Sequence, residues 1–119
     1  MIKYDLHSHT KYSDGSLSAQ ALIALAIEWG ITHLAITDHD TVQAHLQLAE
    51  NNDGHTTEKI NIIKGIELSS QWNNMGVHIV GLNIDIHSTA ITTAVNHQTQ
   101  LRIERVKTIA KKLLQRGFP

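Results

Sequence analysis

Residues 5–15 read Asp-Leu-His-Ser-His-Thr-Lys-Tyr-Ser-Asp-Gly, and the branched and aromatic side chains of residues 2–6 predict a short strand leading into them. His7 and His9 are two positions apart, so on an extended backbone both imidazoles leave the same face. Gly15 permits a positive φ that would bend the Asp14 carboxylate back toward them. Two imidazoles on one face are a ready pair of metal ligands, although two surface or capping histidines have the same spacing.

The composition is that of one small globular domain over residues 1–119, with 41% hydrophobic and 18% charged residues. No apolar run approaches the roughly 20 residues of a membrane span, and the first residues lack the basic and apolar regions of a signal peptide. The chain has no Cys, which excludes disulfides and thiolate zinc sites and leaves any metal to His and carboxylates. We expect a cytoplasmic protein.

Charge and histidine are unevenly represented. Residues 102–119 contain six of the ten Lys and Arg residues and one acid, although the whole chain has a net charge of −1. This basic segment is either a solvated helix face or a surface that holds a phosphate or nucleic acid, for which Arg102 and Arg105 are the candidate contacts. Nine dispersed histidines in 119 residues point toward metal binding.

Strands and helices alternate along the first part of the chain. The predicted elements are a helix over residues 19–29, a strand over 33–37, a helix over 41–49 and a strand over 60–64. Ser18 is the expected N-cap of the first helix, whose apolar side chains predict a largely buried face, and Gly30 is its expected stop. Thr41 is the expected cap of the second helix. The alternation predicts an α/β fold with right-handed crossovers.

The pattern changes after the third strand. Residues 69–72 and 77–82 flank a polar turn at residues 73–76 and predict a hairpin. A helical region with an apolar stripe follows over residues 88–116. The polar run at residues 96–100 marks either a bend or a break between two helices.

In α/β folds the functional sites lie at the carboxyl ends of the strands. His7 and His9 end the first predicted strand, His39 ends the second and Glu67 follows the third. His78 lies on the hairpin strand, which can cross back beneath them. We therefore predict a metal site at this edge of the sheet.

Asp38 and Asp40 flank His39 in the sequence. Either carboxylate can orient an imidazole by accepting its other N–H, although Asp40 is equally well placed to cap a helix. Five further histidines are not expected to bind metal. His33 lies at the opposite end of its strand, His45 and His97 are expected to be solvated, and neither His55 nor His87 has a partner at ligand spacing.

Four motifs together resemble the polymerase and histidinol phosphatase (PHP) family. They are Asp-Leu-His-Ser-His-Thr with Ser-Asp-Gly, then Thr-Asp-His-Asp, Gly-Ile-Glu and His-Ile-Val-Gly-Leu, in the family's order. The resemblance is to the stand-alone bacterial branch of nucleoside 3′,5′-bisphosphate phosphatases and 5′-to-3′ exoribonucleases. It implies a distorted seven-stranded α/β barrel, of which this chain is expected to be the N-terminal half, as an excised fragment or a truncated gene product.

The resemblance also implies a set of metal ligands. Up to three divalent ions (Mn²⁺, Zn²⁺ or Mg²⁺) are held in the complete domain, each with a further ligand from the family's later half. Carried over by motif, the ligands are His7, His9 and Glu67 for one ion, Glu67 and His78 for a second, and Asp14 and His39 for a third.

The activity implied is hydrolysis of nucleotide phosphate esters through attack by metal-bound hydroxide, with a nucleotide or short RNA as substrate. A histidinol-phosphate-type small-molecule phosphatase is the alternative within the family. The other alternative is a non-catalytic PHP interaction module. We expect no membrane partner. By itself the 119-residue chain is expected to be inactive and to self-associate through an open sheet edge.

Overall fold

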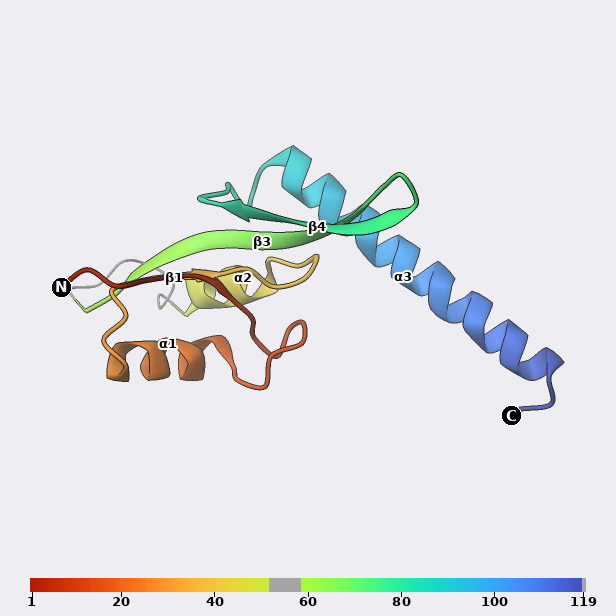
Figure 1. Ribbon diagram of the computed structural model, residues 1–119, viewed down its shortest axis with the longest axis horizontal. Coiled ribbons are helices and arrows are strands. Elements are labelled where there is room, and N and C mark those ends of the chain that lie inside the picture. The colour runs from red at the N-terminus through yellow and green to blue at the C-terminus, as the bar shows by residue number, and fades with distance from the viewer. Residues whose placement is uncertain (52–58, 119) are drawn as a thin grey trace.

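A computed structural model describes residues 1–51 and 59–118. Its elements in chain order are β1 (Tyr4–Ser8), α1 (Ala19–Glu28), β2 (His33–Ile36), α2 (Gln43–Glu50), β3 (Asn61–Trp72), β4 (Met75–Leu82) and α3 (Thr89–Gln115). The strands cross the middle of the molecule, α1 lies below the sheet, and α3 leads away from it to the C-terminus (Figure 1). This projecting helix gives the molecule a longest dimension of 57 Å.

The described strands form one mixed sheet in the order β1-β2-β3-β4. The β1–β2 and β2–β3 pairs are parallel, as the predicted crossovers require, and β3–β4 is antiparallel. Asn73 and Asn74 close the β3–β4 hairpin with φ angles of 51° and 64°, the left-handed conformation that two-residue hairpin turns need. The predicted α/β class and hairpin are therefore confirmed.

The predicted end of the third strand at residue 64 is wrong, because β3 is continuous from Asn61 to Trp72. Its first half pairs with β2, and its second half pairs with β4 from Gly65 opposite Leu82 onward. The antiparallel partner supplies the backbone hydrogen bonds that allow the strand to continue past the β2 pairing. As a result Glu67 lies inside a strand and not at its end.

The main core lies between the sheet and the first two helices. Its buried side chains are Ala19, Ala26, Leu34, Ile36, Ala44, Leu48, Ile60 and Ile62. Ser18 caps α1 as predicted, with its Oγ accepting a 3.1 Å hydrogen bond from the N–H of Ala21. The predicted buried face of α1 is only partly correct, because Leu25 and Trp29 are 40% and 68% exposed. Both line a pocket beside the edge strand β1, where none of the described elements covers them.

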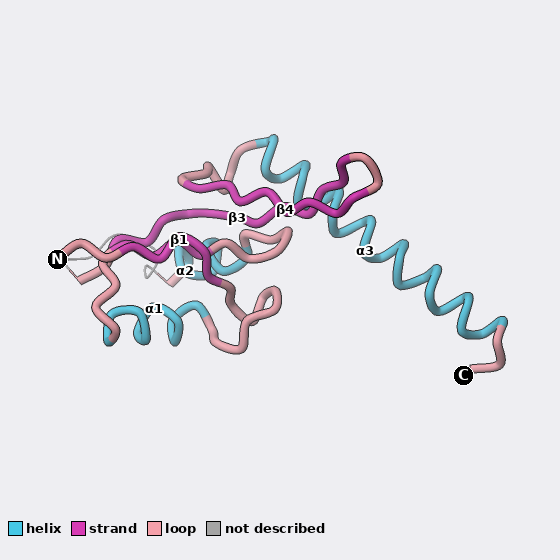
Figure 2. Tube along the Cα trace, in the orientation of Figure 1, coloured by secondary structure: helices cyan, strands magenta, loops and turns pink. Residues whose placement is uncertain are grey.

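The third helix is continuous from Thr89 to Gln115, so the polar run at residues 96–100 does not mark a break between two helices. Ser88 caps it, with its Oγ 3.1 Å from the N–H of Ile91. Its first turns pack on a second core cluster through Ile91 and Val95. Farther along, the predicted apolar stripe is exposed, with Val106 and Leu114 each 65% accessible, because the helix has left the sheet (Figure 2). None of the helices in the described ranges combines the length and apolar character needed to cross a membrane.

His45 is the clearest departure from prediction, because this expected surface histidine is 3% exposed. Its Nε2 lies 2.8 Å from the carbonyl oxygen of Ile36 and 3.2 Å from the nitrogen of Gly65. Helix α2 therefore places the imidazole against the backbone of β2 and β3. Burial lowers the pKa of His45 below its ordinary value of 6.5, although the neighbouring carbonyl of Ile36 favours the charged form.

Because the His45 imidazole is buried, we predict that the free energy of unfolding falls in acid. The unfolded chain binds a proton at His45 more readily than the folded chain, so the contribution is full above the unfolded pKa of about 6.5 and declines as the pH falls below it. The slope is at most about 1.4 kcal/mol per pH unit. Urea unfolding of wild type and His45→Gln in chelator should show the wild-type advantage shrinking between about pH 7.5 and about pH 5.5. The control His97→Gln, at an exposed histidine, should have the same dependence of stability on pH as wild type. Parallel pH profiles of stability for His45→Gln and wild type would contradict the role given to His45.

Candidate metal centre

Backbone hydrogen bonds bring the predicted ligand segments together at one edge of the sheet. The Thr37 N–H donates to the Ser8 carbonyl at 2.8 Å, which joins the end of β1 to the end of β2. The segment after β2 then continues beside β3, where His39 and Glu67 form an isolated parallel bridge. The Glu67 N–H donates to the Asp38 carbonyl at 3.0 Å. Main-chain pairing thus places His39 beside Glu67 and next to the end of β1.

Glu67 is the centre of the site. Its side chain is 5% exposed, and each of its two carboxylate oxygens faces two imidazoles. Oε1 contacts His7 Nε2 and lies 3.2 Å from His9 Nε2. Oε2 lies 2.6 Å from His78 Nδ1 and 3.1 Å from His39 Nδ1. The structure therefore brings together four histidines, from two strands and two loops, around one carboxylate.

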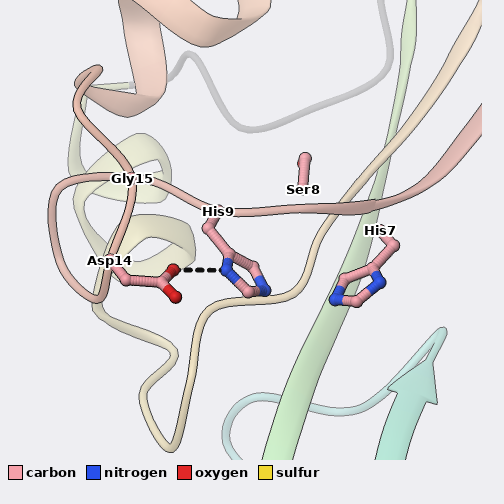
Figure 3. A pocket seen from close by; sticks show the side chains of 5 residues that line it. All are labelled: His7, Ser8, His9, Asp14 and Gly15. Carbon is pink, nitrogen blue, oxygen red and sulfur yellow. Dashed lines mark hydrogen bonds and ion pairs between the residues drawn. The ribbon is translucent and has the colours of Figure 1, made fainter.

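Asp14 is a second carboxylate on the outer side of the same histidines. Its Oδ1 contacts His9 Nδ1, and its Oδ2 lies 3.1 Å from His39 Nε2. Figure 3 shows Asp14 reaching across to His9 from the far side of the loop, with His7 farther along the strand. The imidazoles of His9 and His39 consequently lie between Asp14 and Glu67.

Gly15 has a different role from the one predicted. Positive φ in glycine occurs among the described residues at Gly30 and Gly117, not at Gly15. Instead, a Cβ added at Gly15 would lie 2.4 Å from the carbonyl oxygen of His9. Its N–H donates to the Thr10 carbonyl at 2.9 Å. Gly15 therefore allows the loop to close on its own backbone, which brings Asp14 back to His9.

The two carboxyl groups are anionic at neutral pH. The hydrogen-bond contact with His9 lowers the pKa of Asp14 below its ordinary value of 3.8. Burial acts to raise the pKa of Glu67, but the contacts with His78 and His7 outweigh it, and the net pKa is below the ordinary 4.5. The two carboxylates give the site negative charge that attracts cations.

These side chains fit divalent ions in three overlapping groups. The groups found among the described residues are His7, His9 and Glu67; His9, Asp14 and His39; and His39, Glu67 and His78, with ligand atoms within 4.8 Å of one another. Imidazole nitrogen and carboxylate oxygen are ligands of Mn²⁺ and Zn²⁺. A neutral imidazole offers one lone pair, so His9 and His39 can each serve only one of the two groups in which they occur.

Asp38 and Asp40 have other partners than the predicted imidazole. The Asp38 carboxylate accepts hydrogen bonds from Thr10 and Ser13. Asp40 accepts a 2.7 Å hydrogen bond from the Ser69 N–H and pairs at 2.7 Å with the guanidinium of Arg102. Asp40 does not cap α2, which begins at Gln43 after an N-cap at Val42. Within the described part of the chain, neither carboxylate bonds to an imidazole nitrogen.

The remaining predicted residues lie around this site or away from it. Arg102 is joined to it through Asp40, while Arg105 is exposed on α3. His33 packs at the opposite end of its strand as expected, stacked on Tyr4 with ring centroids 4.4 Å apart. His87 and His97 are exposed, and His55 lies outside the described residues. The roles of Thr10 and Ser13 were missed, although both lie within the first motif.

A mixed sheet with helices and a histidine–carboxylate cluster beside the ends of its parallel strands defines an α/β domain with a candidate metal site. The PHP domain family model matches residues 5–118, and the chain belongs to that family. It is 42% identical over 116 residues to the 5′-3′ exoribonuclease Rnm of Escherichia coli K12, a match that covers 98% of this chain and 39% of that protein. It is 33% identical to a 3′,5′-nucleoside bisphosphate phosphatase of Chromobacterium violaceum, covering 99% of this chain and 40% of that protein.

The fold is similarly shared with solved structures. A Bifidobacterium adolescentis protein assigned as a metal-dependent phosphoesterase superposes with a TM-score of 0.75 at 25% identity, covering 99% of this chain and 40% of that one. This confirms the predicted N-terminal part of a PHP barrel. The chain spans about two fifths of the length of the relatives it matches.

The cluster predicts metal binding that depends on His9, which like His39 has a carboxylate at each ring nitrogen. Calorimetric titration with Mn²⁺ or Zn²⁺ should show that His9→Ala weakens binding by at least about tenfold, because a ligand atom is lost. His97→Ala, an exposed histidine on α3, serves as the control and should bind like wild type. Equal binding by His9→Ala and wild type would refute this placement of the metal.

Proposed function

We propose that this chain carries the metal-binding portion of a phosphoesterase that hydrolyses nucleotide phosphate esters. The observation that carries the proposal is the buried Glu67 carboxylate, which presents one oxygen to His7 and His9 and the other to His39 and His78. The names of the relatives support the substrate class, as one is an exoribonuclease and another a nucleoside bisphosphate phosphatase. We place the activity in the cytoplasm, in keeping with a chain without Cys.

Phosphate esters resist water because their anionic oxygens repel a nucleophile. Divalent ions bound at adjacent positions neutralise those oxygens and lower the pKa of a bound water. The protein's part is to hold those positions together, which Glu67 does by sharing its two oxygens between the two sides of the site. Asp14 adds a second negative charge at the exposed side of the site, which favours the binding of cations there.

The hydroxyl group of Ser8 at the site is not arranged as a nucleophile. Ser8 lines the pocket beside His7 and His9, but its Oγ donates a 2.6 Å hydrogen bond to the Ala35 carbonyl. A serine nucleophile needs a base that accepts its proton, and a backbone carbonyl cannot do so. This contact favours direct attack by water over a covalent phosphoenzyme.

The ligand set also bears on the number and kind of ions. Imidazole-rich sites suit Mn²⁺ or Zn²⁺ better than Mg²⁺, which prefers oxygen ligands. Because His9 and His39 are each shared by two groups, the described residues complete two three-ligand positions at most. We propose that the complete domain holds up to three ions, and that the third ion needs ligands other than the residues of these groups. Arg102 and Arg105 are proposed contacts for substrate phosphate.

Glu67→Gln provides the sharpest test of this function. In the complete gene product with Mn²⁺, phosphate release from a nucleoside 3′,5′-bisphosphate and shortening of RNA from its 5′ end should fall by about a hundredfold or more, because one substitution weakens both positions. Glu28→Gln, an exposed glutamate on α1, is the matched control.

The substrates distinguish the alternatives in the same assay. Preferential hydrolysis of histidinol phosphate would replace the nucleotide proposal with a small-molecule phosphatase. Wild-type protein that binds metal but hydrolyses none of the three substrates would indicate a non-catalytic interaction module.

We also propose that this chain self-associates through the edge of β4. Within the described residues β4 pairs with β3 alone, which leaves a row of unpaired backbone groups on its other side. Ile79 and Met75 on this strand are 55% and 61% exposed, so a second copy added in a symmetric dimer would cover both apolar surface and backbone.

Light scattering of the 119-residue chain tests this association. We expect a dimer for wild type and for the control Gln100→Lys on the exposed face of α3. Ile79→Lys should give a monomer, because a charged side chain at the strand edge opposes pairing. A monomeric wild type would exclude the proposal.

A further inference from the structure

Asp38 carries a buried carboxylate that the proposed chemistry does not use. The residue is 1% exposed. Its Oδ1 accepts hydrogen bonds from the Thr10 N–H at 2.6 Å and from the Ser13 Oγ at 2.7 Å. Its Oδ2 accepts one from the Thr10 Oγ1 at 2.7 Å. A buried carboxylate is unfavourable unless its oxygens are satisfied, and here a single short loop supplies all three of these donors.

That loop carries two of the candidate metal ligands. His9 precedes Thr10, and Asp14 follows Ser13. The N–H groups of Ser13 and Gly15 both donate to the Thr10 carbonyl, at 3.1 and 2.9 Å, so the loop is wound around Thr10. Anchoring Thr10 to Asp38 therefore sets the position from which Asp14 reaches its imidazole partners.

Asp38 also immediately precedes His39, the third member of the group formed with His9 and Asp14. A single carboxylate thus links the two segments that supply this group. By contrast, His7, Glu67 and His78 lie on strands whose register is fixed by backbone pairing. The three ligands of the His9–Asp14–His39 group all lie outside the strands, whereas each of the other two groups contains two ligands on strands.

We propose that Asp38 is a positioning residue that assembles the His9–Asp14–His39 metal group. It acts through the loop and does not itself contact the ion. This inference rests on the metal site proposed above and assigns control of one of its groups to a residue outside it. Removing the anchor should weaken one metal equivalent and leave the strand-held ligands able to bind.

Asp40 provides a matched control on the other side of His39. It is also buried, at 3% exposure, and also accepts two hydrogen bonds. Its partners, however, are Ser69 and Arg102, so it anchors the hairpin and α3 and not the loop. Any effect common to Asp38 and Asp40 variants would reflect general loss of a buried carboxylate near His39.

The first experiment is calorimetric titration of Mn²⁺ into wild type, Asp38→Ala, Asp38→Asn and Asp40→Asn. Asp38→Ala should weaken one equivalent by about tenfold to a hundredfold, the range seen when an outer partner of a metal ligand is removed. Asp38→Asn should recover part of the loss, because its amide oxygen still accepts from the Thr10 N–H while its N–H₂ donates to the Thr10 hydroxyl. Asp40→Asn should bind like wild type.

The second experiment needs no metal. Amide hydrogen exchange in chelator should be at least about tenfold faster at Ser13 and Gly15 in Asp38→Ala than in wild type or Asp40→Asn, because the loop has lost its anchor. Exchange within β3 and β4 should be unchanged, which shows that the fold is intact. If Asp38→Ala does not fold, Ser13→Ala provides a milder variant, because it removes one of the donors to Asp38. Ser13→Ala should weaken Mn²⁺ binding and speed amide exchange in the loop, each by a smaller factor.

The outcomes separate this inference from the proposed function. Wild type that binds no Mn²⁺ overturns both. Wild type that binds Mn²⁺ while Asp38→Ala binds it equally, with unchanged exchange at Ser13 and Gly15, overturns the inference alone. Equal weakening of Mn²⁺ binding by Asp38→Ala and Asp40→Asn also overturns it. Where Ser13→Ala replaces an unfolded Asp38→Ala, unchanged Mn²⁺ affinity and unchanged amide exchange in that variant overturn it as well.

Discussion

The burial of the Glu67 carboxylate is the constraint on which the rest of the structure depends. A carboxylate taken out of water is strongly unfavourable unless charge or hydrogen bonding compensates. Four imidazoles supply that compensation, and they come from β1, the loops after β1 and β2, and the antiparallel strand β4. The strand pairing that forms the sheet therefore also brings the four imidazoles to the Glu67 carboxylate. Fold and site cannot be separated at this residue.

The ligands differ in how firmly the fold holds them. Glu67 and His78 are paired residues of the β3–β4 ladder, so moving either requires breaking it, and His7 lies on β1 between the paired residues Asp5 and Ser8. Asp14 sits on a loop and has a 63% exposed side chain. Precision at a metal site is greater for ligands on rigid elements than for ligands on loops. The strand-held side of the site is thus preorganised, and the loop-held side has more freedom to adapt to a substrate.

The sequence predicted the local features and missed those that depend on distant partners. The prediction that His7 and His9 face the same side and the prediction that Ser18 caps α1 each depend on residues close in the sequence. The structure agrees with both. The continuity of β3 depends on β4, which pairs with it only after the hairpin has closed. The burial of His45 follows from contacts with Ile36 and Gly65 on two strands, which are distant from it in the sequence. Glycine at position 15 was expected to matter, but the reason is a close approach to His9.

Three consecutive residues, Asp38 to Asp40, join most of the parts of this domain. Asp38 binds the first loop, His39 lies between Asp14 and Glu67, and Asp40 binds Ser69 and Arg102. Neighbouring side chains can point to such different partners because Asp40 has a φ of 54°, which turns the chain after His39. Aspartate adopts this left-handed conformation at less cost than most residues, and its two hydrogen bonds offset that cost. Asp40 consequently anchors α3 beside the candidate site, although α3 itself supplies none of the six predicted ligands.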